Sequence, residues 1–542
     1  MSTVRQATEA ARAQTRGPAS QYDAVVIGGG HNGLTAAAYL AKAGMGVLVV
    51  EARATVGGCA STEDVLGGAR VNVCNCDHSL VRATGVIEDL DLERHGLRYL
   101  ELDPSQVMVP WDGSPPWALT GDVDRTLQSL ALTYPREVAN YQRHVRDLMP
   151  VAELVLAMTA GAPELGAVAR RLARLRARGL KGLIRISRMS CTAVLQEYFR
   201  DEALLAAPAT TGPSVWGLDP SLPGTGLGAL GYVLRHAMPV GRPVGGSGRL
   251  TDALESALRA AGGDVLTGHR VERIRVDRVG AVDGITLDDG REIAAPVVIA
   301  AGNPHEALAQ LLQQPAGGKG ARLVRRWRGK PVAMGYESKV DAVVSELPRP
   351  PKLTDEHLAA IGAKHPVAST FVVSPRLSQI AGASDAASVG RIAHRPPMLA
   401  NGPSAMDDSL RPTDGGHVFS LEVLFTPYDL AGSWETRGAA EAERWLDAFA
   451  GLMQPGFREG IQRWRLVGPR DYERDFAMPR GHAPSFSGGP LAALVGRERE
   501  LTRYRTPVPG LYLSGAGTFP GAGVSGAPGR NAAHIVLRDR AR

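Results

Sequence analysis

The chain has 542 residues, 44% of them hydrophobic, and a formal net charge of +6. This length is enough for a sizeable core divided over two or three domains. The modest charge, without a basic and aromatic groove pattern, excludes nucleic acid as an expected partner. No run of about 18 apolar residues predicts a transmembrane helix, and four cysteines are too few for a disulfide framework, so a reducing cytoplasm is the expected location.

Residues 1–20 lack the apolar stretch of a secretory signal and predict a disordered leader. Residues 24–51 then read as a buried strand, a glycine turn, a helix and a second strand that ends on a carboxylate. Gly28 allows the tight turn, Gly30 leaves room for a pyrophosphate, and Gly33 lets the helix approach the strand. Glu51 is placed to accept hydrogen bonds from an adenosine ribose, so this segment predicts a dinucleotide site.

A glycine doublet follows Glu51 by six residues, a spacing that NAD sites lack. It resembles the second FAD signature of the amine oxidase and phytoene desaturase superfamily. The resemblance implies FAD as the cofactor and a loop that approaches its phosphates and ribityl chain. The residues that it assigns to this loop are Arg53, Gly57, Gly58, Ser61 and Thr62.

Two further segments resemble the same superfamily. Residues 271–274 are similar to its strand whose backbone meets the adenine, which assigns Val271 to the cofactor site. Residues 510–533 are similar to its closing FAD motif, with a strand at 511–514, a glycine turn and a helix from about Gly526 whose N-terminus can stabilise negative charge on the flavin. Within it the resemblance assigns Gly515, Gly517, Gly523 and Val524 to the cofactor. The nearest subgroup is that of pyridine-nucleotide-disulfide-oxidoreductase-domain proteins.

The resemblance covers about residues 22–540 and implies an α/β fold. A Rossmann-type FAD-binding domain is interleaved with an α+β substrate domain, which has an antiparallel sheet as a roof and a helical insertion. After the leader, we expect a first FAD-binding segment at 21–124, a helical insertion at 125–240, a second FAD-binding segment at 241–330, the substrate-domain sheet and helices at 331–470, and a third FAD-binding segment at 471–542. Alternating apolar residues predict strands at 332–340 and 417–425.

The helical insertion carries eight basic residues around an apolar stripe with helical spacing, at Leu165, Val168, Leu172 and Leu175. One interpretation is a solvated helix that packs on its own domain, and this is the preferred one. The alternative is an amphipathic helix at an anionic membrane surface, which would recruit the protein peripherally to a lipophilic substrate.

The segment 70–79 is expected to pass near the isoalloxazine and contains Cys74, Cys76, Asp77 and His78. It departs from the carotenoid desaturases, which typically have an aromatic residue, an Asp and a Gly-Pro pair here. Three interpretations stay open for the two thiols and the imidazole: ordinary pocket-lining residues, a covalent link to the flavin, or acid–base catalysis by His78. A metal site is not expected, because the spacing lacks a second ligand pair, and the absence of Cys-x-x-Cys disfavours a redox-active disulfide.

His482 precedes the closing motif by about 30 residues, where the superfamily places a loop over the active site, so it is a further catalytic candidate. His31 is expected beside the cofactor backbone. Phe519 stands where many relatives carry histidine, which predicts an apolar pocket wall there.

Together these features predict an FAD-dependent dehydrogenase, desaturase or oxidase. It would transfer a hydride from a C–H bond of a medium or large organic substrate to flavin N5, in secondary metabolism. No second complete nucleotide motif holds NAD(P)H, so dioxygen or a quinone is the expected electron acceptor. The alternatives are amine or amino-acid oxidation, flavin-dependent isomerisation, and a non-catalytic flavin-binding interaction protein.

Overall fold

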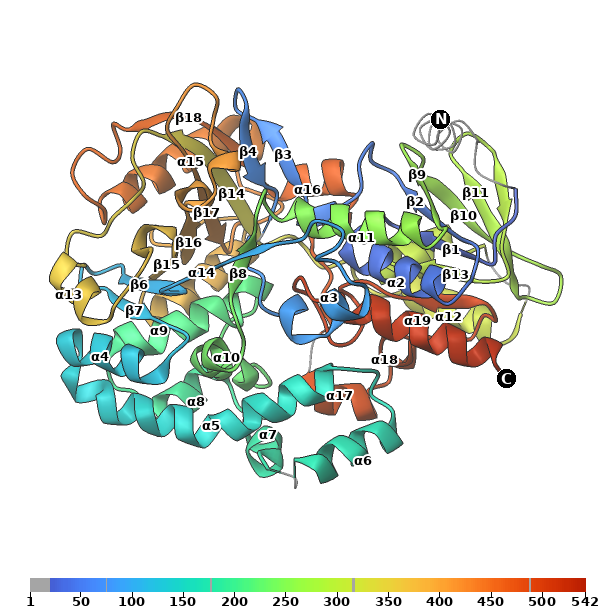
Figure 1. The fold of residues 1–542 in the computed structure, drawn as a ribbon, viewed down its shortest axis with the longest axis horizontal. Coiled ribbons are helices and arrows are strands. Elements are labelled where there is room, and N and C mark those ends of the chain that lie inside the picture. The colour runs from blue at the N-terminus through green and yellow to red at the C-terminus, as the bar shows by residue number, and fades with distance from the viewer. Residues whose placement is uncertain (1–19, 75, 176–177, 314–316, 487–488) are drawn as a thin grey trace, which may run out of the picture.

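The computed structural model describes residues 20–542 apart from 75, 176–177, 314–316 and 487–488. The expected leader, except for its last residue, lies outside this range. In Figure 1 the parallel sheet and the helices that cover it lie on the right, and a larger sheet lies on the left. A layer of helices runs along the bottom of both. The site is built where these three regions meet.

The parallel sheet has five strands in the order β19-β13-β1-β2-β9. These are β1 (Ala24–Ile27), β2 (Val47–Glu51), β9 (Asp264–Thr267), β13 (Val298–Ala300) and β19 (Leu511–Leu513). The central strands are continuous runs of small and β-branched residues, the composition of a strand that is covered on both faces. The three expected FAD-binding segments, 21–124, 241–330 and 471–542, therefore each contribute at least one strand to this sheet.

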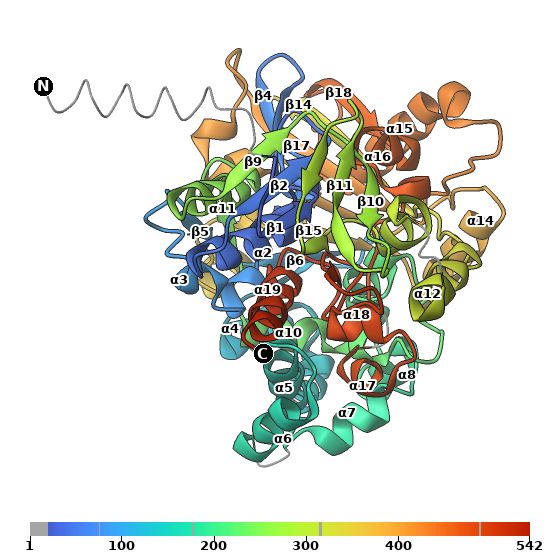
Figure 2. The same cartoon turned by 90° about the vertical axis from the view of Figure 1, so that its right-hand side faces the viewer.

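Helices α2 (His31–Lys42), α11 (Gly248–Ala260) and α19 (Ala527–Arg540) cover one face of this sheet. The other face packs against a three-stranded antiparallel sheet and against α12 (Gly318–Arg328), as Figure 2 shows. That sheet consists of β10 (Val271–Val276), β11 (Val282–Leu287) and β12 (Glu292–Ala294). α19 begins directly after Gly526, where the sequence predicts it.

The larger sheet has seven strands in the order β18-β14-β17-β16-β15-β6-β7 and is antiparallel except for the β15–β6 pair. The strands are β6 (Gln106–Pro110), β7 (Trp117–Leu119), β14 (Glu337–Val344), β15 (Thr370–Ser374), β16 (Met398–Asn401), β17 (His417–Leu424) and β18 (Ile461–Val467). The prediction of a strand from residue 332 was wrong at its start, because regular pairing with β17 begins only at Glu337.

The two faces of the seven-stranded sheet differ. Its outer face packs on α15 (Trp434–Ala450) through Phe419, Trp445 and Phe449. Its inner face packs, over some of its area, on a two-stranded ribbon, β3 (Thr62–Val65) with β4 (Ala69–Asn72), where Val71 meets Val343. A second ribbon pairs β5 (Tyr99–Glu101) with β8 (Gly241–Pro243). The ribbon β3–β4 therefore brings the chain that leaves the glycine doublet onto the inner face.

The helical layer consists of α4 (Val123–Thr133), α5 (Val138–Thr159), α6 (Leu165–Arg174), α7 (Leu180–Ile186), α8 (Cys191–Gln196), α9 (Glu202–Thr211) and α10 (Gly231–Ala237). Its core contains large aromatic side chains such as Tyr141 and Phe199. The apolar stripe of the basic segment packs on this core through Val168, Leu172 and Leu175. The side chain of Leu165 and residues 176–177 lie outside the described residues.

The other helices are short or peripheral: α3 (Val86–Asp89), α13 (Asp355–Ala360), α14 (Leu377–Ser388), α16 (Pro469–Phe476), α17 (Gly489–Val495) and α18 (Arg499–Arg503). Among the described residues, no helix combines the length and apolar character needed to cross a membrane.

Candidate functional site

The first glycine loop joins β1 to α2 in a conformation that only glycine adopts easily. Gly28 has φ of 100° and donates its N–H to Val50 O at 2.8 Å. A Cβ on Gly33 would lie 2.0 Å from the Gly28 carbonyl oxygen, whereas a Cβ on Gly30 would meet no protein atom within 4 Å. Gly33 is therefore required by the protein itself, and Gly30 faces open space at the N-terminus of α2, where an anion is favoured.

Glu51 holds the edge of this loop. Its carboxylate accepts hydrogen bonds from the backbone N–H of Gly29 at 2.7 Å and of Arg53 at 2.9 Å. These bonds fix the carboxylate at the end of β2. There it can accept further hydrogen bonds from the hydroxyls of a ribose.

The glycine doublet packs directly on the first loop. Gly57 has φ of 121°, and its N–H donates to Gly29 O at 2.9 Å. A Cβ on Gly58 would lie 3.4 Å from Gly30 Cα. The two loops thus form one backbone-lined surface, although β2 and most of α2 separate them in the chain.

The side chains around the doublet serve mainly to hold it. Arg53 pairs with Glu63 at 2.5 Å and lies 4.4 Å above the ring of Phe476. Ser61 Oγ donates to Gly58 O at 2.6 Å. Thr62 Oγ1 accepts from the N–H of Gly248, at the first residue of α11, at 3.0 Å.

The closing motif completes the same surface. The N–H of Val81 donates to Val524 O at 3.0 Å. A Cβ on Gly523 would lie 2.8 Å from Leu80, and a Cβ on Gly515 would lie 2.4 Å from Ala301 O. These glycines allow the C-terminal turn to approach its neighbours closely.

Packing fixes three further residues, two in the closing motif and one in β10. A Cβ on Gly517 would lie 2.5 Å from Pro304. Val271 is a buried first residue of β10. Phe519 is fully enclosed and contacts Phe486 with ring centroids 5.8 Å apart, so the prediction of a pocket wall at Phe519 was wrong.

Buried polar atoms at this surface fit a polar ligand. His31 Nε2, Asn32 Oδ1 and Ser514 Oγ are buried, and none has a hydrogen-bond partner within the described ranges. Unpaired buried polar atoms are costly in a folded protein unless a ligand or water satisfies them. Burial lowers the pKa of His31 to about 4, so its imidazole is neutral. The open space at Gly30 and these orphaned atoms suit a dinucleotide cofactor.

His78 and Cys76 are held rather than free. His78 is buried, with Nδ1 at 3.0 Å from Tyr99 Oη and Nε2 at 3.1 Å from Ser247 Oγ. Burial lowers the pKa of His78 to about 3. Burial also raises the pKa of the Cys76 thiol to about 12. Neither side chain is therefore in a state suited to proton transfer or nucleophilic attack near neutral pH.

Cys74 connects the glycine doublet to the inner face of the seven-stranded sheet. Its thiol lies near that of Cys59, the residue directly after the doublet. This contact, followed by burial, raises the pKa of Cys74. Two carboxylates of the sheet, Glu337 and Glu422, lie close enough to Cys74 to influence the pKa values of this group.

Glu337 and Glu422 form a hydrogen-bonded carboxyl pair on β14 and β17. Burial raises both pKa values, and that of Glu337 lies well above its usual range. Lys339, directly opposite Glu422 across the two strands, opposes this rise on Glu422. Two carboxyls this close do not both ionise readily, so the pair is expected to hold one proton near neutral pH, and Lys339 favours the charged form of Glu422.

Lys339 is fixed by its own partners. Its ammonium donates to Asp341 and to the backbone oxygen of Asn72, and its side chain is 6% exposed. Asp341 also accepts from Ser420 Oγ at 2.7 Å and from Arg465 Nε at 3.1 Å. This network holds a cation beside Glu422.

His482 lies at the border of the same cluster. Its ring contacts Tyr336 with centroids 5.9 Å apart, and Tyr336 directly precedes Glu337. Burial lowers the pKa of His482. Of the four catalytic candidates in the sequence, the structure brings Cys74 and His482 towards the carboxyl pair and locks Cys76 and His78 into packing contacts.

Sequence reasoning missed Glu337, Lys339 and Glu422. A signal was present, because charged residues interrupt two otherwise apolar strands at these positions. Strand period alone places Glu337 and Lys339 on one face. It does not show that this face is turned towards the glycine loops.

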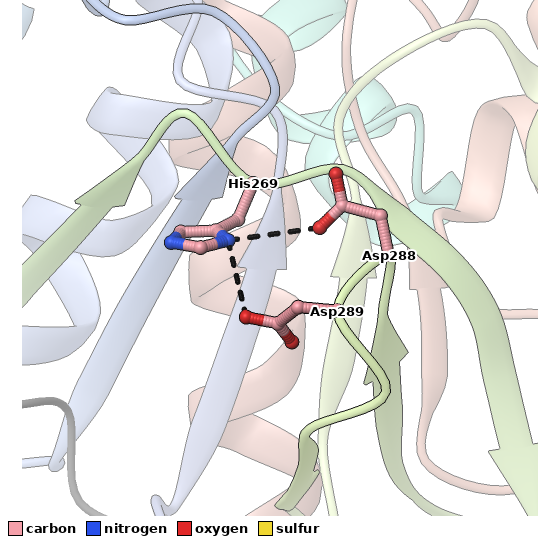
Figure 3. A group of neighbouring side chains, drawn as sticks. All are labelled: His269, Asp288 and Asp289. Atoms are coloured by element: carbon pink, nitrogen blue, oxygen red, sulfur yellow. Dashed lines mark ion pairs between the residues drawn. The ribbon is translucent and has the colours of Figure 1, made fainter.

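A surface group could hold a metal ion. His269 Nδ1 lies 3.6 Å from Asp288 and 3.5 Å from Asp289 (Figure 3). Arg291 already pairs with Asp289 at 2.6 Å and contacts His269 at 2.9 Å. The group is a partly exposed cluster of paired charged side chains next to β10, and it lies away from the carboxyl pair. We assign neither a metal ion nor a function to it.

The fold and the glycine loops define a dinucleotide-binding oxidoreductase of the flavin type. Residues 26–81 match the family of NAD(P)-binding Rossmann-like domains, and residues 134–386 match the flavin-containing amine oxidoreductases. In overall structure the chain is similar to putrescine oxidase, with a TM-score of 0.61, 19% identity and coverage of 97% of this chain and 100% of the other.

Among curated proteins, the chain is 31% identical to pyridine nucleotide-disulfide oxidoreductase domain-containing protein 2 of Rattus norvegicus, over 96% of this chain and 94% of the relative. It is 24% identical to the lycopene-forming phytoene desaturase of a Paracoccus species, over 96% and 98%. The chain belongs to the family of pyridine nucleotide-disulfide oxidoreductase domain-containing protein 2, within the amine oxidase and phytoene desaturase superfamily. It is a flavin-dependent oxidoreductase whose cofactor is FAD, and FAD supplies hydride-accepting chemistry when bound.

Proposed function

We propose that the chain is an FAD-dependent dehydrogenase or oxidase that introduces a double bond into a medium or large organic substrate, in secondary metabolism. The observation that supports this proposal is the position of the carboxyl pair on the inner face of the seven-stranded sheet. Lys339, directly opposite Glu422, donates to the backbone oxygen of Asn72 at the end of β4, so the pair lies close to the chain that follows the glycine doublet. A base thus lies next to the expected cofactor site.

The proposed division of labour follows from the charges. Forming a double bond removes a hydride from one carbon and a proton from its neighbour. We assign the role of base to Glu422, because its raised pKa makes its carboxylate a better proton acceptor than an ordinary one. Lys339, held by Asp341, limits that rise and so favours the ionised form of Glu422.

We propose for the cofactor site the residues that the glycine loops bring together. Gly30, Gly57 and Gly58 would line the phosphates, Gly28 and Gly33 would shape the loop around them, and Glu51 would bind the ribose. Arg53, Ser61, Thr62 and Val271 support this surface from the side. The closing turn with Gly515, Gly517, Gly523 and Val524 would complete it near the isoalloxazine.

The test is anaerobic mixing of the holoprotein with candidate substrates while the yellow absorbance of oxidised FAD is followed. A hydrocarbon or alcohol that removes the colour supports the proposal. Glu422→Gln should then lower the rate of colour loss by about 10²- to 10⁴-fold and leave bound FAD unchanged. An unchanged rate in Glu422→Gln would exclude Glu422 as the base.

Amine oxidation is the second candidate, and the carboxyl pair favours it. A pair with one shared proton carries one negative charge inside the protein, which would attract a substrate ammonium group. If primary amines remove the FAD colour and hydrocarbons do not, amine oxidation replaces the first candidate. Peroxide produced with turnover in air would separate an oxidase from an isomerase and identify dioxygen, rather than a quinone, as the acceptor.

We further propose a cytoplasmic enzyme. The four cysteines are unpaired, as suits a reducing compartment. The basic segment of the helical layer uses its apolar stripe for packing in its own domain, so we retain peripheral membrane contact only as the alternative, to be tested by flotation with anionic vesicles.

A further inference from the structure

A cavity of about 270 Å³ lies where the helical layer meets the seven-stranded sheet. The ends of β6 and β15 line it, together with the first residues of α9, the start of α14 and Arg395 from the loop before β16. Pockets for drug-sized ligands are usually roughly 300–1,000 Å³, so this cavity suits a smaller molecule.

Hydrogen bonds between these segments hold the walls of the cavity in place. The N–H of Trp111 donates to Ser374 O at 3.1 Å, and its indole Nε1 donates to Pro396 O at 3.0 Å. The N–H of Leu377, the first residue of α14, donates to Glu202 Oε2 on α9 at 3.0 Å. The cavity is therefore formed before a ligand enters, which limits the cost of ordering on binding.

Ser374 has an unsatisfied hydroxyl at this cavity. Its side chain lines the cavity and is 7% exposed, and Oγ has no hydrogen-bond partner among the residues that the structure describes. Because side chains alternate along a strand, Ser374 lies on the same face of β15 as Val372, which packs against Leu205 of α9. A buried hydroxyl without a partner is costly unless a ligand or water satisfies it.

The charges that line the cavity are only partly paired with one another. Three carboxylates and two guanidiniums line it, and Arg376 lies 3.6 Å from Asp112. Asp201 and Glu202 each accept one backbone N–H, at 3.0 Å, and pair with no cation in the described part of the chain. Arg395 is exposed and has neither a hydrogen bond nor an ion pair with any described residue. Two carboxylates and one guanidinium therefore remain for a ligand.

A molecule with one carboxylate and two cationic groups would complement these charges. The planar guanidinium of Arg395 matches a carboxylate through two parallel hydrogen bonds. Ammonium groups can donate to Asp201 and Glu202, and the hydroxyl of Ser374 can donate or accept. Trp111 adds an apolar wall, which suits a short methylene chain.

We propose that this cavity binds a basic amino acid such as lysine. Two strands separate β15, which carries Ser374, from β14, which carries Glu337, so the cavity lies about 14 Å across the sheet from the carboxyl pair. The proposal therefore adds a second binding site to the protein and does not depend on the proposed function. A ligand held here connects α9 to the sheet and should stabilise the folded state.

The test is calorimetric titration of the FAD-loaded protein with L-lysine, L-norleucine and cadaverine. Norleucine lacks the side-chain ammonium of lysine, and cadaverine lacks the carboxylate. L-lysine should bind at least about tenfold more tightly than either, because each loses a charge-assisted hydrogen bond. It should also raise the melting temperature.

Glu202→Gln and Arg395→Gln should each weaken L-lysine binding by about tenfold. Both variants should fold, because Arg395 is exposed and a glutamine at 202 can still accept the N–H of Leu377. Glu356→Gln, in the first turn of α13, and Arg391→Gln, in the same loop as Arg395, are exposed control substitutions. Neither should change the binding of L-lysine.

Equal binding of the three probes, or no binding of L-lysine, would overturn the proposal. So would undiminished binding in Glu202→Gln and Arg395→Gln. Binding that is lost in Glu422→Gln but normal in Glu202→Gln would place L-lysine at the carboxyl pair and would also exclude the proposed cavity. If the cavity variants lose L-lysine and no substrate removes the FAD colour, the proposed oxidation fails while this site stands.

Discussion

The glycine loops of the parallel sheet and the inner face of the seven-stranded sheet meet at one site but offer different groups to it. The loops present backbone amides, and residues such as Gly28, Gly33 and Gly57 keep side chains out of the way. The sheet presents the ionisable side chains of Glu337, Lys339 and Glu422. The loops depend on the absence of side chains at their glycines, whereas the sheet provides titratable side chains.

This difference has a physical consequence. In the loops, a methyl group added at Gly33 would collide with the backbone of Gly28, so this substitution should destroy the site. In the sheet, the backbone ladder is independent of which side chain stands on the inner face, so substitution should change the chemistry and leave the fold. Substitutions in the two regions can therefore test this difference.

Gly33→Ala should give the largest effect. Its Cβ would lie 2.0 Å from Gly28 O, so the loop must distort and the protein should lose FAD together with much of its stability. Gly30→Ala is the matched control, since its Cβ meets no protein atom within 4 Å. It should fold normally yet bind FAD roughly tenfold more weakly or worse. Visible flavin absorbance relative to protein absorbance and thermal melting measure both; a Gly30→Ala protein with undiminished FAD affinity would refute the assigned pyrophosphate position.

Asp77→Asn should have the next largest effect on stability. It breaks the buried pair with Arg242 and leaves that guanidinium without its carboxylate, at a cost of about 3–5 kcal/mol in the free energy of unfolding. Asp475→Asn breaks a more exposed pair with Arg474 and should cost at most about 1 kcal/mol. Denaturant titration measures both, and equal small losses would show that the Asp77 pair is not desolvated.

Glu337→Gln should raise stability at alkaline pH by about 1–2 kcal/mol. Burial raises the pKa of both carboxyls above the ordinary value of 4.5. Between pH 4.5 and the raised pKa values, the folded state therefore holds more protons than the unfolded state. The free energy of unfolding of the wild-type protein therefore falls as pH rises from about 4.5 through the raised pKa values, then stays low.

The glutamine introduced by Glu337→Gln can still donate a hydrogen bond to Glu422, but one titrating group is removed. Melting temperatures measured from about pH 5 to about pH 9 should therefore fall less steeply in the variant. Glu93→Gln, at an exposed position, is the control and should follow the wild-type curve. Parallel curves for all three proteins would contradict a shared proton in the carboxyl pair.

Acid precipitation should have the smallest effect on the polypeptide. Both ring nitrogens of His78 are hydrogen-bonded and the Cys76 thiol is protonated, so neither is expected to be joined to the flavin. The yellow colour should leave with the supernatant. Colour retained in the pellet would point to Cys74, and Cys74→Ser would then release it.

The sequence by itself determined the parallel sheet, the two glycine loops and the closing turn, because their chemistry depends on backbone conformation and on local spacing. A glycine at Gly28 or Gly57 marks a positive φ wherever the rest of the chain lies. The strand around residues 417–425 and the helix after Gly526 were likewise predicted from local pattern. The start of β14 was not, because pairing with β17 sets it.

Only the tertiary structure decided which charged side chains face the glycine loops. Glu337 and Glu422 are 85 residues apart and meet because β14 and β17 pair in one register. Asp77 and Arg242 are 165 residues apart and form a buried pair because the chain after β4 packs beside β8. Long-range register and the desolvation of a charge depend on the whole packed fold, and no local spacing in the sequence encodes them.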